Sequence, residues 1–346
     1  MLNFMENHSS NALVRANLDH ITKFGKSYQA GKSSSVHSLK TFREIMGSHS
    51  VLSNPRDRIF TSEIEPMIFD PGLASARFLY ILSGSNEVDP IAFYSHGVRQ
   101  FSDDGKHLHG SSYGRRLFAK NKDGESQMEH LLDVLRTQPN STRGTLAIYS
   151  AEDCGRDSRD IPCALDFTLS PRNEVLHGTL FMRANAGLRL MPYNLFEFTM
   201  IQEWVARQCD LILGEYHHSV VSMHLRDDEL SVGSTIANEE VSTPEMAHMP
   251  ETSQDFHHVL LSEEERIRQE IDTWTPESAS RQIEELHRKF GHYWGDLLSA
   301  VILRAFRVTH NRQDIHQLLQ ALSQYDEGPL LSTTRTIYEK TDRVMG

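Results

Sequence analysis

Stretches of apolar residues at helical or alternating spacing divide the central part of the chain into predicted elements. Apolar residues recur with the period of an α-helix, and this pattern predicts helices over 73–83, 91–101, 129–137 and 195–211. Shorter runs of β-forming residues predict strands over 145–150 and 216–225. The helix over 195–211 is apolar enough to be the core helix of a domain, so Cys209 on it is expected to be structural.

Two further apolar runs, 164–169 and 175–182, flank the segment Ser170-Pro-Arg-Asn-Glu174. β-forming residues around a Pro/Asn turn are typical of a β-hairpin. Cys163 stands just before the first strand and Arg183 near the end of the second. The two ends of such a hairpin lie side by side, so we expect a thiol next to a guanidinium.

The two ends of the chain differ from its centre in composition and in predicted elements. Residues 1–37 are polar, with one amphipathic helix over 11–26, and 231–260 is rich in Ser, Thr, Glu and Pro, which is typical of a loose linker. Ser262-Glu-Glu-Glu265 predicts a capping box, Pro276 starts another helix, 294–306 is apolar enough to be buried, and 313–323 supplies a last helix. We therefore expect an N-terminal extension (1–37), a core (38–230), a linker (231–260) and a helical C-terminal extension (261–346).

Composition sets the broad class. The chain has 346 residues, of which 38% are hydrophobic and 24% charged, and its net charge is -12, as suits a soluble globular protein and argues against nucleic acid or an anionic membrane as a partner. Its three cysteines cannot form a disulfide framework, and nothing resembles a signal peptide or a membrane span. A cytoplasmic protein with reduced thiols is expected.

The pair of Cys163 and Arg183 suggests a chemistry. The thiolate is the nucleophile, and a nearby arginine stabilises the anion and so lowers the pKa of the thiol. A soft nucleophile that adds to an electron-poor carbon, with arginines to hold a phosphate, suits a nucleotide substrate. A lone cysteine in an apolar strand is also a common inert core residue, and this alternative stays open.

Several motifs resemble those of the thymidylate synthase and deoxycytidylate hydroxymethylase family. The similarity extends over about 38–230 and has no gap from Cys163 to His224; the motifs are Gly110-Ser-Ser-Tyr-Gly114, Pro139-Asn-Ser-Thr-Arg143, Pro162-Cys163, Arg183, Pro192-Tyr-Asn194, Gly214 and His224-Leu225. The resemblance implies an α+β fold in which a twisted mixed sheet packs against helices, here with an added C-terminal helical extension. It also implies a homodimer whose sheets pack back to back and whose sites are composite.

By this resemblance, Cys163 attacks C6 of a pyrimidine nucleoside monophosphate, so that C5 becomes nucleophilic toward a one-carbon unit. Tyr113 assists proton movement, and the product is a 5-methyl or 5-hydroxymethyl pyrimidine. Arg183 binds the phosphate. Arg143 reaches across the dimer to the phosphate in the partner's site, where it could form charge-assisted contacts.

Three further positions complete the implied substrate site. Arg43 falls where a mobile loop brings an arginine to the phosphate, although a solvated loop arginine is an equal alternative. Asn194 offers both a donor and an acceptor, which suits uracil more than cytosine. His224 contacts the sugar or the waters near the base. The sequence does not choose between ribose and deoxyribose.

Departures from the family concentrate on the side where it binds folate. Arg77 replaces a glutamate that organises waters over the pyrimidine, Ala186 an aspartate that binds the pterin, and Leu190 a glycine. The resemblance implies methylenetetrahydrofolate as the donor, and these positions argue against it. Arg226 replaces a sugar-binding tyrosine, so Arg77 and Arg226 are available to another anion. The alternative function is an altered scaffold that binds a nucleotide or a protein partner.

The histidines over 216–225 raise the question of a metal. His217 and His218 are adjacent on a predicted strand and face opposite ways, and no acidic or cysteine partner has ligand spacing. The sequence therefore predicts no metal site.

Overall fold

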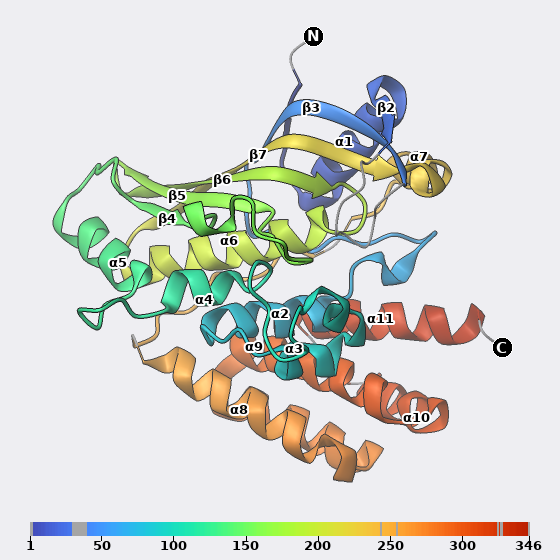
Figure 1. Cartoon of the computed structure of the whole chain (residues 1–346). Coiled ribbons are helices and arrows are strands. Elements are labelled where there is room, and N and C mark those ends of the chain that lie inside the picture. The colour runs from blue at the N-terminus through green and yellow to red at the C-terminus, as the bar shows by residue number, and fades with distance from the viewer. Residues whose placement is uncertain are drawn as a thin grey trace.

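The computed structural model describes residues 3–29, 40–242, 244–253, 255–323, 325 and 328–344 (Figure 1). Its centre is a seven-stranded sheet in the order β1-β3-β7-β6-β5-β4, with β2 paired to β3. The strands are β1 (Phe4–Asn7), β2 (Lys26–Gln29), β3 (Thr41–Leu52), β4 (Thr145–Ala147), β5 (Ala164–Arg172), β6 (Val175–Ala186) and β7 (Ile212–Arg226).

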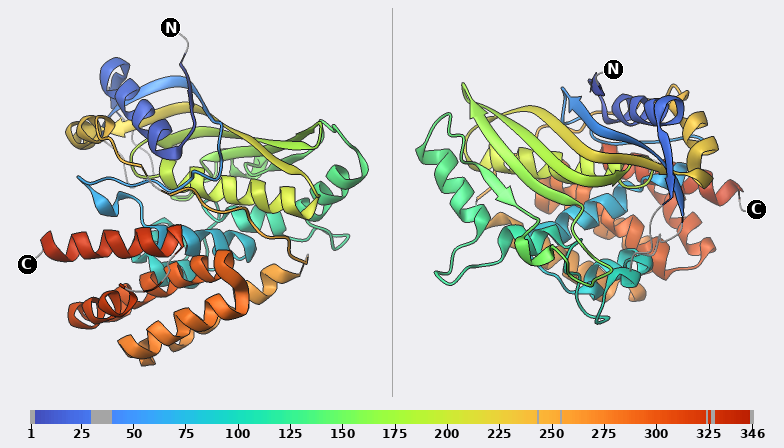
Figure 2. Two further views of the ribbon diagram at one scale, coloured as in Figure 1. Left: turned by 180° about the vertical axis from the view of Figure 1, so that it is seen from behind. Right: turned by 45° about the horizontal axis from the view of Figure 1, so that its top comes forward.

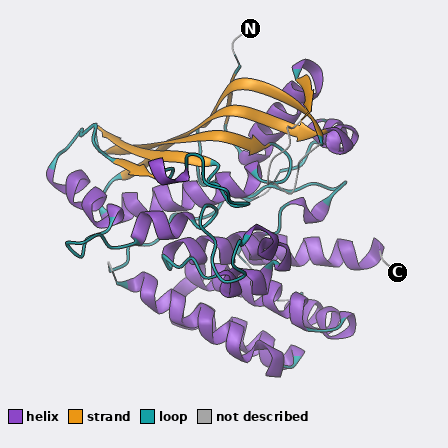
Figure 3. Ribbon diagram, in the orientation of Figure 1, coloured by secondary structure: helices purple, strands orange, loops and turns teal. Residues whose placement is uncertain are grey.

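The sheet is mixed, because β1 and β3 are parallel, as are β6 and β7, while the other pairs are antiparallel. Figure 3 shows that the strands form one layer and most of the helices lie below it. The helices are α1 (Ser10–Phe24), α2 (Pro71–Leu82), α3 (Val88–Tyr94), α4 (Tyr113–Phe118), α5 (Gln127–Thr137), α6 (Met191–Gln208), α7 (Leu230–Ala237), α8 (Phe256–Glu270), α9 (Pro276–Thr309), α10 (Arg312–Leu322) and α11 (Pro329–Val344). The predicted α+β class is confirmed.

α6 is the central helix that packs against one face of the sheet. All its residues from Met191 to Ala206 are buried, and it packs against β6 and β7. No helix of the described residues covers the other face of the sheet. Large apolar side chains are exposed along it, namely Phe4, Met46, Phe181, Ile212 and Val221. Figure 2, on the right, looks down on this uncovered face.

The N-terminal residues are part of the core. β1 pairs with β3 through Phe4 and His49, and Leu13, Val14 and Leu18 of α1 are fully buried. Describing 1–37 as a polar extension was therefore wrong for the part that the structure describes, because buried apolar residues at helical spacing tie α1 to the sheet. The boundary at 37/38 lies outside the described residues.

The C-terminal helices form a second helical layer under α2 (Figure 2, left). Asp70, the N-cap of α2, links the C-terminal helices to α2. Its carboxylate accepts hydrogen bonds from Leu73 N–H and from the Tyr338 hydroxyl at 2.7 Å, and it pairs with Arg304 at 3.1 Å. The added layer is thus joined to the core by a buried polar contact as well as by apolar packing.

Several predicted boundaries differ from the structure. Ser262 lies inside α8 and does not cap it, since the helix already starts at Phe256, within the expected linker. Residues 91–101 split into α3 and a short 3-10 turn (His96–Phe101) because Ser95 has an extended φ of -146°. α11 was not predicted. Among the described residues, no helix combines the length and the apolar character needed to cross a bilayer.

Candidate active site

The hairpin of β5 and β6 brings Cys163 and Arg183 together as predicted. The Arg183 backbone N–H donates to the Cys163 carbonyl at 2.9 Å. The turn is tighter than expected and has two residues, Asn173 (φ 50°) and Glu174 (φ 67°), both in the left-handed region. Such a turn matches the twist of a hairpin. It fixes the register and therefore the position of the two ends.

The Arg183 guanidinium is held against the segment that precedes the thiol. Its Nε donates to the Pro162 carbonyl at 2.8 Å and its Nη2 to the Ile161 carbonyl at 3.0 Å. Burial raises the pKa of the Cys163 thiol, and the positive charge of Arg183 opposes that shift while Asp160 adds to it. The arginine acts in the expected direction, but burial is the larger effect, so the pKa of the thiol lies above its ordinary value.

Tyr113 lies beside Cys163. The Gly110 and Ser111 backbone N–H groups donate to the Asp160 carboxylate at 2.8 and 2.9 Å, which ties the loop before α4 to the strand end at Cys163. A Cβ at Gly110 would lie 2.3 Å from the Asp160 carbonyl oxygen, so this close approach requires glycine. Burial raises the pKa of Tyr113, and the negative charges of Cys163 and Glu197 raise it further. A hydrogen bond with the Ala164 backbone lowers this pKa and so opposes the shift.

Asn194 joins the same neighbourhood from the first turn of α6. It is buried, and its Nδ2 donates weakly to Met182 Sδ at 3.7 Å. Met182 is the register partner of Ala164, the residue after Cys163. The carboxamide, the thiol and the phenol thus approach one end of the hairpin from three different elements.

An ion pair between a half-buried arginine and a buried glutamate, which the sequence did not predict, lies next to these residues. Arg77 on α2 pairs through Nε with Oε1 of Glu197 on α6, and its guanidinium lies over the Tyr193 ring at 5.2 Å. Glu197 is 1% exposed, and its Oε2 has no hydrogen-bond partner among the described residues. One sequence signal was available, namely a glutamate among apolar residues (Leu195, Phe196, Phe198) three residues after Asn194, where i and i+3 share a helix face.

Neither Arg77 nor Arg226 is available as a free cation. Arg226 pairs with Asp228 at 3.1 Å and with Glu229 at 2.8 Å, and Arg77 pairs with Glu197. The expectation that the two arginines recognise an additional anion is therefore wrong, because each is already neutralised by a carboxylate.

Arg143 is not brought to Cys163 of the same chain. Its carbonyl accepts from Thr145, which pairs with Thr168 on β5, five residues along the strand from Cys163. At the rise of a β-strand this is about 16 Å. Arg143 is exposed at this other end of the strand. A contact of Arg143 with the phosphate in a partner's site stays a prediction.

Arg43 lies on a strand and not on a mobile loop. It is within β3, where it pairs with Leu225 on one side and Ser27 on the other, and its Nη1 donates to the Thr22 carbonyl at 3.2 Å. The expected loop was wrong. The local sequence has only a weak preference for a strand, and pairing with a neighbouring strand on each side makes residue 43 part of β3. A phosphate contact of Arg43 stays a prediction.

His224 lies on β7 opposite Ala186 of β6, on the strand next to Arg183. Its ring meets Phe42 edge-on at 5.2 Å and its Nδ1 lies 3.3 Å from the Ser222 carbonyl. A contact with the sugar stays a prediction.

The positions of the family's folate contacts do not offer a matching donor set. Ala186 has no polar side-chain atom, and Leu190, just before α6, exposes 43% of an apolar side chain. A pterin would find neither a carboxylate nor a small residue there. The residues present therefore do not fit a folate bound in the family's usual way.

The expectation that the strand histidines lack an acidic partner was wrong. Glu215 stands two residues before His217 on β7, and His177 on β6 completes a group whose donor atoms lie within 4.8 Å of one another. Sequence spacing alone missed it because His177 is brought in by strand pairing.

Comparison with known proteins agrees with the fold. The model of the family "Thymidylate synthase" matches residues 74–263, which is more than half of the chain. A deoxyuridylate hydroxymethyltransferase of Pseudomonas phage M6 is 27% identical over 174 residues, 46% of each chain. A thymidylate synthase of Bacillus subtilis subsp. natto is 26% identical over 161 residues, which is 44% of this chain and 56% of that one. The chain thus spans about half the length of the curated relatives it matches.

The thermostable thymidylate synthase A from Bacillus subtilis shares the fold, with a TM-score of 0.57 and 18% identity over 68% of this chain and 87% of that one. The fold and the site define an α+β protein with a cysteine and an arginine at paired strand ends. The chain belongs to the thymidylate synthase family. The match begins later than the expected residue 38 and runs past 230 into α8.

Proposed function

We propose that this protein transfers a one-carbon group to C5 of a pyrimidine nucleoside monophosphate through a covalent adduct between Cys163 and C6. The observation that carries the proposal is that Arg183 and Tyr113 lie against Cys163 from separate elements, while Asn194 contacts Met182, the register partner of the next residue, Ala164. Two of the similar relatives are named deoxyuridylate hydroxymethyltransferases. With an asparagine at 194, a uridylate is the substrate we favour.

The chemistry follows from a thiolate beside an electron-poor ring. Cys163 Sγ adds to C6, and the electron pair of the C5–C6 double bond passes to C5. C5 then attacks the carbon of an aldehyde- or iminium-type one-carbon donor, whose π electrons pass to its oxygen or nitrogen. An aldehyde donor leaves the hydroxymethyl group directly, whereas with an iminium donor the C–N bond breaks after loss of the C5 proton and the amine departs. Loss of the C5 proton to a base returns an electron pair, reforms the double bond and expels the thiolate. Arg183 holds the phosphate and Asn194 orients the base in this proposal.

Glu197 is the base that we assign to the C5 proton. It supplies a carboxylate near the position where the family carries its glutamate, since its partner Arg77 occupies that position. Its unpartnered Oε2 and its effect on the pKa of Tyr113 support a place beside the phenol. General bases of this kind contribute about 10²–10⁴-fold in rate.

Arg143 acts in this proposal on the phosphate of a partner molecule. Its distance along β5 from Cys163 and the exposed apolar residues of the open sheet face support a homodimer packed through that face. Two such faces meeting back to back would cover these side chains.

A second candidate function is a scaffold that binds the nucleotide without turning it over. The departures at Ala186 and Leu190 favour it, because the donor site is the altered part. The test is release of tritium from C5 of UMP, dUMP, CMP and dCMP, with and without methylenetetrahydrofolate. Release that is lost in Cys163→Ala and retained in Cys154→Ser supports the transferase. Nucleotide binding without release from any of the four supports the scaffold.

A further inference from the structure

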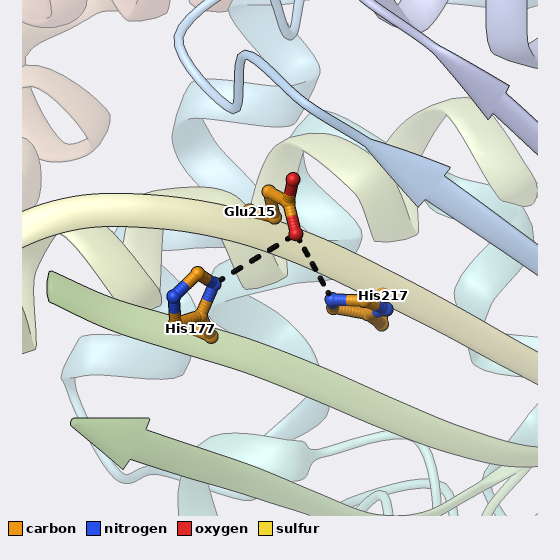
Figure 4. A group of neighbouring side chains, drawn as sticks. All are labelled: His177, Glu215 and His217. Carbon is orange, nitrogen blue, oxygen red and sulfur yellow. Dashed lines mark ion pairs between the residues drawn. The ribbon is translucent and has the colours of Figure 1, made fainter. Parts of the chain in front are cut away.

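A group of two histidines and one glutamate lies on the open face of the sheet, away from Cys163 (Figure 4). His177 belongs to β6 and Glu215 and His217 to β7, and the three side chains are 33%, 44% and 27% exposed. Glu215 Oε2 lies 3.9 Å from His177 Nδ1 and 3.6 Å from His217 Nε2. These separations are too long for hydrogen bonds. Glu215 thus lies at ion-pair distance from both imidazoles (Figure 4), and the three donor atoms face one another.

The spacing suits a small divalent ion. Zinc binds imidazole nitrogen at about 2.0–2.1 Å and carboxylate oxygen at about 2.0–2.2 Å, so tetrahedral ligands lie roughly 3.3–3.5 Å apart. The donor atoms of Glu215 and each histidine need to move closer by only a few tenths of an ångström. The donor atoms of His177 and His217 lie within 4.8 Å of each other and move further. Partly exposed side chains can make such movements. Two histidines and a carboxylate also form a ligand set that zinc uses in proteins.

The backbone beneath the group is fixed. The pairing of β6 and β7 shifts between Leu176 and Gly178, where one residue of β6 faces two of β7, and this bulge aims His177 at Glu215. From the other face, Gln202 Nε2 on α6 donates to the carbonyls of Leu176, Gly214 and Glu215 at 2.9 to 3.1 Å. One buried amide thus holds both strands at the bulge.

Gly214 leaves room for the imidazole. A Cβ there would lie 3.0 Å from His177 Nδ1, the atom that faces the carboxylate. A larger residue at 214 would push the donor atom away from the group.

An outer contact orients His217. Its Nδ1 lies 3.4 Å from His49 Nε2, and His49 Nδ1 lies 2.7 Å from Ser219 Oγ. Metal-binding histidines commonly use their second nitrogen in this way, and the contact leaves Nε2 directed at Glu215. Because Nδ1 is engaged, Nε2 is the nitrogen that can bind an ion.

We propose that His177, Glu215 and His217 bind a Zn²⁺-like divalent transition metal ion. The sheet face that carries them is the one assigned above to the homodimer contact, so in the dimer the ion lies within that contact, with a water molecule enclosed there as its fourth ligand. The ion bridges β6 and β7 and so links two strands of the central sheet. This assignment is independent of the proposed nucleotide chemistry, since none of the three residues belongs to the group around Cys163.

The test is a titration of the full chain, with any affinity tag removed and after dialysis against EDTA, with ZnSO₄ by calorimetry. Substitution of Co²⁺ then reports coordination by its visible spectrum. We expect one Zn²⁺ per chain, a tetrahedral Co²⁺ spectrum and a rise in Tm with zinc. His177→Ala and His217→Ala should each weaken binding by roughly 100-fold or more, and His49→Ala by about 10–100-fold, as expected for a supporting contact.

His130→Ala is the matched control. His130 also lies near a glutamate, Glu125 at 3.0 Å, but it is an exposed side chain on α5 and not part of the sheet. It should leave the zinc affinity unchanged. Equal unfolding temperatures of all variants in EDTA establish that they fold. Absence of saturable zinc binding, or binding that His177→Ala and His217→Ala leave unchanged, would overturn the proposal.

Discussion

Half-buried Arg77 on α2 and buried Glu197 on α6 form an ion pair next to Tyr113. The family carries a glutamate where this chain has Arg77, so a carboxylate is kept in the neighbourhood but is supplied by a different helix. The positive charge that the substitution introduces is neutralised by the same contact. In the proposed mechanism Glu197 takes the place of the family's glutamate, so the change at 77 relocates the acidic group.

Glu197→Gln tests the role of this carboxylate. The amide keeps the shape but cannot accept the C5 proton, so we expect tritium release to fall by about 10²–10⁴-fold while nucleotide affinity changes little. Unaltered release would remove Glu197 from the proposed mechanism. The thermal unfolding of Glu197→Gln must be measured as well, because loss of one partner of a buried ion pair costs about 3–5 kcal/mol of stability and would itself lower activity.

The double variant Arg77→Glu/Glu197→Arg separates charge from position. It keeps an ion pair between α2 and α6 and restores the family's glutamate. We expect its Tm to exceed that of Arg77→Glu alone, because that single variant places two carboxylates side by side. A double variant no more stable than Arg77→Glu would mean that the pair does not couple the two helices.

The reactivity of Cys163 should depend on pH in a defined way. Burial raises the pKa of the thiol and Arg183 opposes the shift, so Arg183→Ala is expected to raise the pKa further. The thiolate fraction at neutral pH then falls, and the rate of iodoacetamide alkylation falls with it. The rate is measured against pH in a Cys154→Ser background, because Cys154 is exposed. A profile that stays the same after Arg183→Ala would show that the two groups do not interact.

Subunit mixing tests the composite site. Arg143→Ala and Cys163→Ala should each have low activity as homodimers, since each lacks one part of every site. Coexpression of the two should restore about one quarter of the wild-type sites, because half of the random dimers are mixed and each has one intact site. No recovery in a preparation shown by ultracentrifugation to contain mixed dimers would place Arg143 outside the partner's site.

Asp70→Ala should loosen the C-terminal helices. Its carboxylate is buried and binds Arg304 and Tyr338, so we expect a loss of about 3–5 kcal/mol in the free energy of unfolding. The control is Asp89→Ala, which removes an exposed pair with Arg99 and should cost about 0–1 kcal/mol. Similar losses in urea denaturation of both variants would contradict the linking role of Asp70.

The parts of the structure that could be predicted from sequence are those fixed by local patterns. α2, α6 and the hairpin around Cys163 follow from helical spacing, alternation and turn residues close together in the chain. Arg43 on β3 and the pair of Arg77 and Glu197 depend on contacts between residues far apart in sequence. The location of Arg143 at the far end of β5 depends on strand pairing, and its role depends on a second molecule.

The most direct test of the proposed function is release of tritium from C5 of dUMP and UMP by the wild-type protein and Cys163→Ala. Addition of Cys163 to C6 makes the C5 proton exchangeable, so we predict release from at least one uridylate by the wild type and none by Cys163→Ala. Release that persists without the thiol would contradict the covalent adduct.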